Sequence, residues 1–180
     1  MPRLLRRWGM AIPIFVLVLL LAVAGIVFGG RGQEGRLIDA GGSRVFVADG
    51  DTLHIGAETV RLARLDAVER TQFCLDAQGT SWSCGQTALA TLGRIVARGA
   101  LHCTAIERDH YGRTLAHCTV AGGGDVGAAM VEAGWAVADG PRYAAEQQAA
   151  RAAKRGIWAG RFEIPRIWRD RHRIEPKMVR

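Results

Sequence analysis

One short stretch of the sequence contains four charged side chains that could form a site: Asp51, Arg61, Asp66 and Glu69. The acids fall beside a glycine turn or at a predicted strand end, where carboxylates and carbonyls surround hard cations such as calcium. No cluster of His and Cys accompanies them, which disfavours zinc. Phosphoryl chemistry uses this combination, because a cation and an arginine offset charge on phosphate oxygens while a spare carboxylate orients or deprotonates water. On these residues alone, a solvated acidic turn with an ordinary salt bridge is an equally weighted alternative.

Three short strands are predicted to position these side chains. Strand-forming residues run over 45–49 and again over 52–55, with Gly50 between them, which indicates a hairpin. A further strand is predicted over Thr59–Leu65, with Arg61 near its middle. An arginine in the middle of such a strand is unusual, which marks it as a candidate site residue.

A second segment presents another arginine from a tight turn. Residues 108–116 connect two predicted strands, Leu101–Ile106 and Thr114–Val120. Gly112 lies at the tip of the turn and Arg113 directly follows it. We therefore expect Arg113 to project from the end of a hairpin.

Four pieces of the sequence, taken together, resemble the staphylococcal nuclease, or thermonuclease-like, family. They are ADGDTL at 48–53, VRLARLDAVE at 60–69, DHYGRTLA at 109–116 and MVEAGWA at 130–136. They occur in the family's order, and the similarity covers residues 43–169. The resemblance implies an α+β fold, an OB-fold-type five-stranded β-barrel carrying three helices. It also implies calcium-dependent cleavage of phosphodiester bonds in DNA or RNA.

The resemblance implies a calcium site on matched positions. Asp51 and Asp66 are similar to the family's calcium carboxylates, and the backbone carbonyl of Ala67 completes the protein's share of ligands. Asp49 is similar to a nearby acid that supports the metal site. An all-oxygen site of this kind also suits magnesium or manganese, and the family resemblance favours calcium.

The remaining matched positions concern water and phosphate. Glu69 resembles the residue that positions or deprotonates the attacking water, and Arg61 and Arg113 resemble the phosphate-binding arginines. Tyr111 is similar to a ring that hydrogen-bonds a substrate phosphate. One departure is Val68, which stands where the family usually has a proline that stiffens the loop before the glutamate.

Residues 1–30 have the pattern of a membrane-targeting segment. Three arginines precede an uncharged apolar run over Gly9–Gly30, and roughly 20 apolar residues suffice to cross a bilayer. The arginines favour the cytoplasmic side, which places the rest of the chain beyond the membrane. Ala22–Ala24 offers a cleavage site, yet the apolar run continues past it, so we favour an uncleaved anchor over a signal peptide. We expect a membrane-anchored domain on the non-cytoplasmic side, or a secreted or periplasmic one if the segment is cleaved.

The other boundaries follow from composition. Residues 31–42 are glycine-rich and predict a flexible tether, residues 43–169 form the domain, and residues 170–180 form a basic tail. The formal net charge is +7, but the excess lies near the two ends of the chain. Nucleic-acid binding by the body must therefore come from local placement of cations. A solvated tail is favoured over one that binds a polyanion or a membrane surface.

The four cysteines are expected to form two disulfides. Cys74 and Cys84 bracket a loop of low regular structure, and a bridge there would restrict the unfolded chain. Cys103 and Cys118 flank the turn at 108–113, at positions that paired strands would bring together. An even count in an exported chain supports these two pairs, whereas the spacing disfavours zinc.

Three helices are predicted from apolar stripes: Thr87–Ala97, Val126–Ala133 and Tyr143–Arg155. The tryptophans are interpreted as core or surface lids, and none is assigned to substrate. Two classes of function remain, a nuclease acting on DNA or RNA and an inactive binding module on the same barrel. All five matched carboxylates and arginines are present, which favours the enzyme. We expect a monomer.

Overall fold

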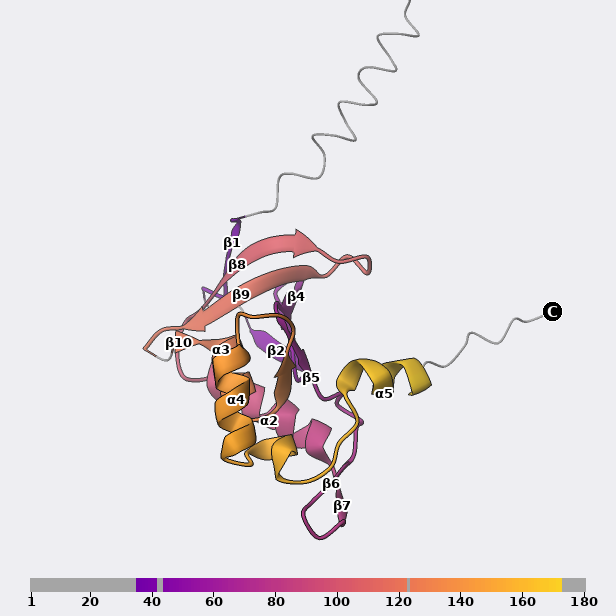
Figure 1. Ribbon diagram of the computed structural model, residues 1–180. Coiled ribbons are helices and arrows are strands. Elements are labelled where there is room, and N and C mark those ends of the chain that lie inside the picture. The colour runs from indigo at the N-terminus through magenta and orange to yellow at the C-terminus, as the bar shows by residue number, and fades with distance from the viewer. Residues whose placement is uncertain (1–34, 42–43, 123, 173–180) are drawn as a thin grey trace, which may run out of the picture. The chain divides into compact units, whose positions relative to one another are not determined.

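The computed structural model describes residues 35–41, 44–122 and 124–172 (Figure 1). The chain divides into two units, residues 1–33 and residues 34–180, and every described residue belongs to the second. The expected membrane segment over 1–30 therefore lies outside the described residues. Within the described part of the chain, no helix is both long and apolar enough to span a bilayer.

A curled sheet makes up much of the domain (Figure 1). Its strand order is β1-β8-β9-β4-β3-β2, and β10 pairs with the outer part of β9. The strands are β1 (Leu37–Asp39), β2 (Val45–Asp49), β3 (Thr52–Ile55), β4 (Glu58–Leu62), β8 (Leu101–Arg108), β9 (Thr114–Val120) and β10 (Gly124–Asp125). Neighbouring strands are antiparallel except β4 and β9, which run parallel.

Two short strand pairs and four α-helices complete the described residues. The pairs are β5 (Leu65–Ala67) with β11 (Ala136–Ala138), and β6 (Cys74–Leu75) with β7 (Ser81–Trp82). The helices are α2 (Cys84–Val96), α3 (Val126–Glu132), α4 (Ala144–Ala152) and α5 (Pro165–His172), with a 3-10 turn at Gly156–Ala159. The expected α+β class is confirmed, whereas the expected five-stranded barrel is found as a curled, open-ended sheet. Three of the helices were expected, and α5 was not.

The strand predicted over Thr59–Leu65 is wrong in its second half. Strand β4 ends at Leu62, and Arg64 has a φ of 65°, a left-handed conformation that ends the strand. The Arg64 carbonyl accepts a hydrogen bond from the Asp139 backbone at 2.9 Å. The chain thereby leaves the large sheet and pairs with β11 as β5, which turns the acids after Leu65 back toward Arg61.

Part of the tether predicted over 31–42 is a strand. Leu37–Asp39 pair with β8 as strand β1, and Ile38 is buried beneath it. The glycines around this strand predict a flexible segment. In the structure, however, three residues pair with the edge strand β8, and the buried side chain of Ile38 packs into the core. At the other end, α5 extends past the expected domain boundary at 169, to His172.

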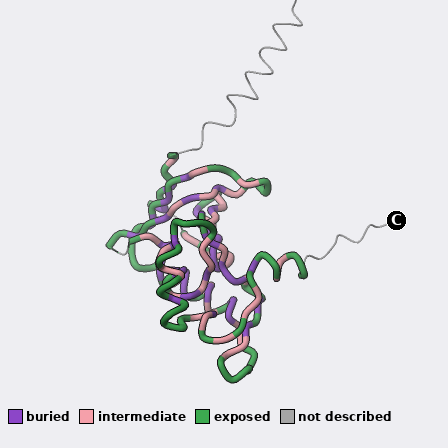
Figure 2. The backbone as a smooth tube through the Cα atoms, viewed as in Figure 1, coloured by how far each residue is buried: buried purple, intermediate pink, exposed green. Residues whose placement is uncertain are grey.

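The core lies between the inner face of the sheet and helices α2 and α3 (Figure 2). Its largest fully buried side chains include Leu53, Leu62, Leu92, Leu101 and Met130. Burying each such side chain contributes roughly 1.5–3 kcal/mol. Because the strands that carry the candidate site also supply this core, the site rests directly on the core.

Both expected disulfides are confirmed. Cys74 and Cys84 are bridged with a Cα–Cα distance of 5.6 Å, and this bridge ties the start of α2 to β6. Cys103 and Cys118 face each other directly on β8 and β9 and are bridged as well. The first bridge therefore constrains the loop after Glu69, and the second constrains the hairpin that carries Arg113.

Candidate functional site

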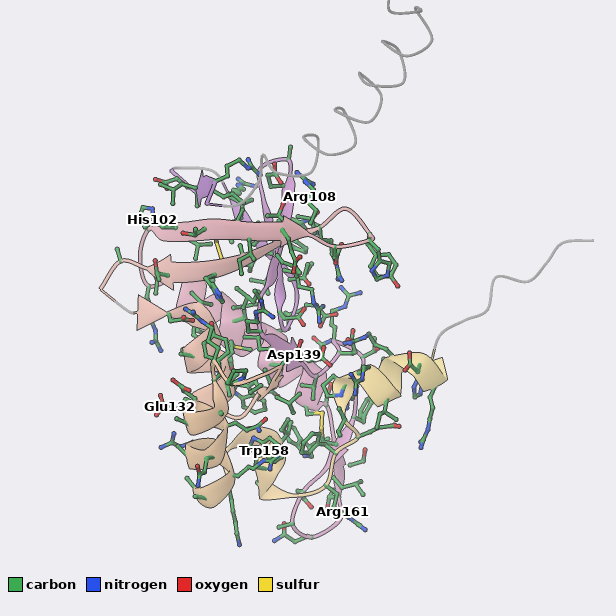
Figure 3. The ribbon with its side chains drawn as sticks, turned by 45° about the horizontal axis from the view of Figure 1, so that its top comes forward. His102, Arg108, Glu132, Asp139, Trp158 and Arg161 are labelled. Carbon is green, nitrogen blue, oxygen red and sulfur yellow. A yellow bond between two sulfur atoms is a disulfide. The ribbon has the colours of Figure 1, made fainter. Side chains whose placement is uncertain are left out.

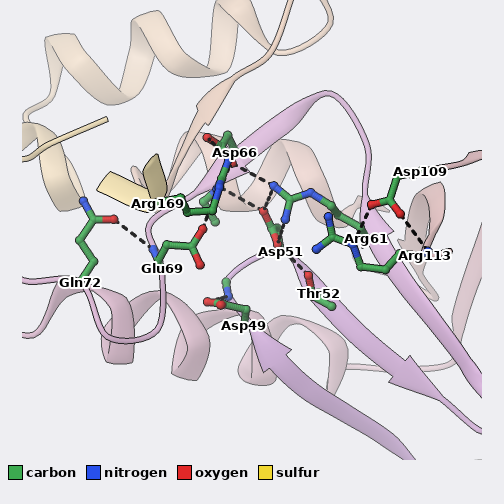
Figure 4. A network of polar contacts seen from close by, with 12 residues as sticks. Asp49, Asp51, Thr52, Arg61, Asp66, Glu69, Gln72, Asp109, Arg113 and Arg169 are labelled. Atoms are coloured by element: carbon green, nitrogen blue, oxygen red, sulfur yellow. Dashed lines mark hydrogen bonds and ion pairs between the residues drawn. The ribbon is translucent and has the colours of Figure 1, made fainter. Parts of the chain in front are cut away.

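A cluster of charged side chains forms where β3, β4 and β5 meet (Figure 4). Thr52 pairs with Arg61 in the register of β3 and β4, so Asp51 lies beside Arg61 across the hairpin. The Leu62 backbone donates to the Asp51 carbonyl at 2.8 Å, which fixes this end of the hairpin. After the turn at Arg64, β5 brings Asp66 to the same point.

Asp51 is the buried anchor of the cluster, with 3% of its surface exposed. Arg61 grips both of its oxygens, with Nη1–Oδ1 at 2.9 Å and Nη2–Oδ2 at 2.7 Å. The Thr52 hydroxyl donates to Oδ1 at 2.9 Å. Burial raises the pKa of Asp51, and the Arg61 charge opposes that shift. A two-pronged arginine contact of this kind holds the carboxylate in one orientation.

Arg61 also joins Asp51 to Asp66. Its Nη2 lies 2.9 Å from Asp66 Oδ1, and both side chains are 14% exposed. The arginine that is unusual in the strand pattern thus lies between two acids. Its remaining exposed edge faces the groove described below.

Glu69 is held from both its backbone and its side chain. Gln72, which is fully buried, accepts a hydrogen bond from the Glu69 backbone at 3.1 Å and donates to the Glu163 carbonyl at 2.7 Å. Gly85, in the first turn of α2, lies so close that a Cβ there would collide with the Glu69 carbonyl oxygen. The buried Val68 backbone donates to Trp135 at 3.2 Å, a bond that a proline could not make.

The carboxylate of Glu69 contacts an arginine that the sequence did not indicate. Arg169 of α5 donates from Nη1 to Glu69 Oε1 at 2.6 Å, and to both oxygens of Asp66 at 2.8 and 3.2 Å. Burial raises the pKa of Glu69, Arg169 lowers it, and the nearby Asp49 charge raises it again. Burial likewise raises the pKa of Asp49, against a hydrogen bond of 2.8 Å from the Gly50 backbone.

The second arginine lies on the β8–β9 hairpin, as expected. Asp109 accepts from Arg113 Nε at 2.7 Å and from the Arg113 backbone at 2.9 Å. Partial burial raises the pKa of Asp109, but the bonds from Arg113 outweigh it and bring the pKa below its usual value. Tyr111 is 67% exposed, and the Arg113 guanidinium lies 5.3 Å from the centre of its ring. Asp109 therefore aims Arg113, and Tyr111 presents an open ring beside it.

These residues line a single groove of about 980 Å³. Asp49, Arg61, Asp66 and Glu69 lie along one side of it, and the β8–β9 hairpin and helix α5 contribute its two walls. Figure 3 labels Asp139, a lining residue that directly follows β11. Each expected site side chain except the buried Asp51 lines this groove, and Asp51 supports it from below through Arg61.

Three residues of the site escaped the sequence analysis: Gln72, Asp109 and Arg169. Asp109 is the first residue of the motif DHYGRTLA, and its position four residues before Arg113 is a signal from which the ion pair could be predicted. Gln72 carries no pattern that distinguishes it from a loop residue. Arg169 looked like one more cation of a basic C-terminal region, because only the docking of α5 brings it to the acids.

The donor chemistry of the cluster suits a hard divalent cation. Asp49, Asp51, Asp66 and Glu69 are oxygen donors only, and when ionised they exceed the charge of Arg61 and Arg169 by two. In the described part of the chain, however, no group of three or more His, Cys, Asp or Glu side chains is arranged to hold a metal ion. The oxygens of Asp66 and one oxygen of Glu69 contact guanidinium groups instead.

A curled sheet bearing a carboxylate and arginine cluster in an open groove defines an OB-like α+β domain with a site suited to phosphate. A family model described as "Staphylococcal nuclease homologue" matches residues 59–160. This match covers more than half of the chain, and the chain belongs to the staphylococcal nuclease family. The matched residues include Arg61, Asp66, Glu69 and Arg113, whereas α5 lies beyond them.

Curated relatives have related names. The chain is 37% identical over 122 residues to "Succinoglycan biosynthesis protein ExoI" of Rhizobium meliloti, covering 65% of this chain and 64% of that protein. It is 32% identical over 143 residues to an "Uncharacterized endonuclease" of Escherichia coli O157:H7, covering 74% of this chain and 87% of the relative. It is also 32% identical to "Probable endonuclease LCL3" of Schizophyllum commune, covering 63% of this chain and 45% of the relative. The chain thus spans less than two thirds of the first of these proteins.

Proposed function

We propose that this protein is a calcium-dependent nuclease that hydrolyses phosphodiester bonds of DNA or RNA outside the cytoplasm. The observation that carries the proposal is the convergence of Arg61, Asp66 and Glu69 in one groove, with Arg113 on the hairpin wall of the same groove. The names of the Escherichia coli and Schizophyllum commune relatives support the same activity.

In this proposal, Glu69 orients and deprotonates the water that attacks phosphorus in line. Its burial and the neighbouring Asp49 raise the pKa of Glu69, which makes it a better base than an exposed glutamate. Gln72 holds its backbone, so the carboxylate starts from a fixed position. Proton transfer from a positioned water to such a base contributes about 10²–10⁴-fold to the rate.

The two arginines stabilise the negative charge that develops on the phosphate oxygens. Arg61 acts from the floor of the groove and Arg113 from its hairpin wall, and each is aimed by a carboxylate. Tyr111, beside Arg113, hydrogen-bonds a phosphate of the substrate. The products expected from the family pattern carry 3′-phosphate and 5′-hydroxyl ends.

Calcium completes the proposed site. Asp51, Asp66 and the backbone carbonyl of Ala67 would hold the ion, with Asp49 supporting them, and the ion would polarise a phosphate oxygen as a Lewis acid. Asp66 makes contacts to both Arg61 and Arg169, so cation binding must compete with at least one guanidinium. This competition predicts that calcium binds more weakly to the native protein than to a variant that lacks Arg169.

We infer that the nuclease domain acts on the non-cytoplasmic side of a membrane as a monomer. The apolar segment 1–30 supports an anchor, or a signal peptide if it is cleaved. The disulfides Cys74–Cys84 and Cys103–Cys118 fit an oxidising compartment. Fractionation of cells that express the full-length chain tests the location, and sedimentation in mild detergent tests the monomer.

The activity is tested by incubating the full-length, oxidised protein in mild detergent with single-stranded and duplex DNA and RNA. Calcium is supplied first, and excess chelator is then added. We expect cleavage that needs calcium and that falls by about 10²–10⁴-fold in Glu69→Gln. Glu132→Gln is the matched control, because Glu132 lies on α3 away from the groove, where it pairs with Arg155 (Figure 3).

Two outcomes would contradict the proposal. A folded, disulfide-bonded sample that cleaves nothing with any divalent ion would favour the alternative, a catalytically inactive module that binds nucleic acid or protein. A Glu69→Gln variant with native turnover would remove Glu69 from its proposed role while leaving the nuclease intact.

A further inference from the structure

Helix α5 forms a wall of the groove although it lies outside the residues that match the family model. It packs against β5, the strand that carries Asp66. Arg169 fixes its orientation, because the guanidinium bonds both oxygens of Asp66 and one oxygen of Glu69. The helix is therefore held at the proposed catalytic centre by charged contacts from its own second turn.

The two long faces of α5 differ in character. Arg166, Trp168 and His172 line the groove, whereas Ile167 and Arg171 line a separate hollow on the other side of the helix. Trp168 and His172 are four residues apart, as are Ile167 and Arg171, so each pair shares a side of the helix. Arg166 is two residues from Trp168 and lines the groove from the opposite margin of the groove face. The groove face carries arginines, the rings of Trp168 and His172, and the carboxylate of Asp170, whereas the opposite face carries an apolar side chain and one paired cation.

Arg166 is an available cation on the groove face. It is exposed, and within the described part of the chain it makes no hydrogen bond or ion pair. Arg171, on the opposite face, pairs with Glu163 at 3.2 Å. An exposed arginine beside a phosphodiester site can bind a phosphate with two parallel hydrogen bonds.

Trp168 supplies a flat aromatic surface in the same groove. Its ring stacks on His172, with centroids 4.1 Å apart and planes 13° from parallel. The His172 ring nitrogen also contacts the Trp168 carbonyl at 2.9 Å, so the pair is held along the helix. Across the groove, Tyr111 is 67% exposed on the hairpin wall.

We propose that α5 is a substrate-binding element that holds a single nucleic-acid strand, with Arg166 on a phosphate and Trp168 stacked on an unpaired base. Each wall of the groove then offers one ring and one arginine, Tyr111 with Arg113 and Trp168 with Arg166. Stacking needs an open base face, which a single strand provides and a paired duplex does not. The inference rests on the proposed nuclease function and names the part of the substrate that α5 contacts.

Binding is measured without cleavage, by fluorescence anisotropy of labelled oligothymidine about ten nucleotides long in excess chelator. The full-length, oxidised protein is compared with Arg166→Gln and with its matched control Arg171→Gln, which removes an identical charge from the other face of α5. We expect Arg166→Gln to weaken binding about fivefold and to reduce the salt slope by about 0.7, while Arg171→Gln stays within about twofold.

The aromatic contact is tested with two substitutions of Trp168. Trp168→Ala is expected to weaken oligothymidine binding about tenfold, whereas Trp168→Phe keeps a stacking surface and is expected to lose no more than about threefold. Circular dichroism and the native thermal midpoint check that α5 is still folded in each variant. With calcium present, these variants are expected to raise KM much more than they change kcat.

Equal binding by Arg166→Gln and Arg171→Gln, or native binding by Trp168→Ala, would overturn the inference. Such a result, with calcium-dependent cleavage intact, would leave the nuclease in place and restrict its substrate contacts to the family-matched residues. Conversely, selective loss of binding in a protein that never cleaves would support α5 as a nucleic-acid element while the nuclease proposal failed.

Discussion

Arg169 Nη1 lies 2.6 Å from Glu69 Oε1, a contact between residues 100 positions apart. The same guanidinium contacts both oxygens of Asp66, and its side chain is 34% exposed. Partial burial disfavours the charged form, but the two carboxylates raise the pKa of Arg169 above its usual value. The guanidinium thus balances two acids that would otherwise repel each other across a partly buried site.

Replacing Arg169 with Gln is expected to lower the free energy of unfolding in chelator by about 1–2 kcal/mol, because two partly buried carboxylates lose their cation. Saturating calcium is expected to reduce this loss, since an ion that binds only the folded state stabilises it. Urea titrations with chelator and with calcium measure both values. Arg155→Gln, at a surface pair with Glu132, is the control and should lose less than about 0.5 kcal/mol in either condition. An Arg169→Gln deficit that calcium does not change would contradict the link between this arginine and a cation.

Gln72→Met should destabilise the fold by about 2–4 kcal/mol, because the Glu69 amide and the Glu163 carbonyl lose their partner inside the protein. Met keeps the volume, so the loss reports hydrogen bonding and not a cavity. Turnover is expected to fall as well, since the Glu69 backbone is no longer held. Gln86→Met, at an exposed position on α2, is the control for both measurements. Native stability in Gln72→Met would show that the buried amide contributes little.

Arg113→Ala is expected to lower kcat by about 10²–10³-fold and to change KM by much less, because its charge matters most in the transition state. Asp109→Asn should give a smaller loss of kcat, since the arginine remains but its Nε partner is weaker. Steady-state kinetics on one oligonucleotide separates the two parameters. Arg98→Ala, just beyond α2, serves as the charge-matched control. A rise in KM alone would make Arg113 a binding residue without a role in the chemical step.

The stability of the metal-free protein should depend on pH through Glu69. Burial raises the pKa of this carboxyl from its ordinary 4.5. A group whose pKa is raised on folding stabilises the fold below its ordinary pKa and loses that contribution as pH rises through the raised value. Glu69→Gln should therefore gain free energy of unfolding relative to the native protein in chelator as the pH rises from 4.5 toward neutrality. A difference that stays constant across this range, or one that falls, would indicate that Arg169 outweighs burial.

Much of the site could be predicted because it is local in sequence. Asp51, Asp66 and Glu69 lie near predicted strand ends, and Gly112 marks the turn that presents Arg113. Strand periodicity and turn preferences depend on only a few neighbouring residues, so such positions can be predicted without knowledge of distant contacts. The pairing of the four cysteines could be predicted for the same reason, since each disulfide closes a short segment of the chain.

The parts that escaped prediction depend on contacts between distant segments. The packing of α5 against β5 brings Arg169 to Asp66 and Glu69, and no local sequence pattern predicts this packing. Arg64 adopts a left-handed conformation, which is uncommon for a residue other than glycine, and so the predicted strand runs three residues past the end of β4. Strand β1 forms by pairing with the edge of β8, and its own glycine-rich surroundings do not predict that pairing.

The bridge between Cys103 and Cys118 has a mechanical consequence for the hairpin. The bridge joins directly opposed residues of β8 and β9, so the two strands cannot slide or separate at that point. Arg113 lies five residues beyond Cys118 along the ribbon, a length of about 17 Å at the usual rise of a strand. Between the bridge and Arg113, residues 114–116 of β9 also pair with β4, so the sheet holds this strand up to the residue that follows Arg113. The turn that joins β8 to β9, and not the opening of the strands, then governs how far Arg113 can move toward a phosphate.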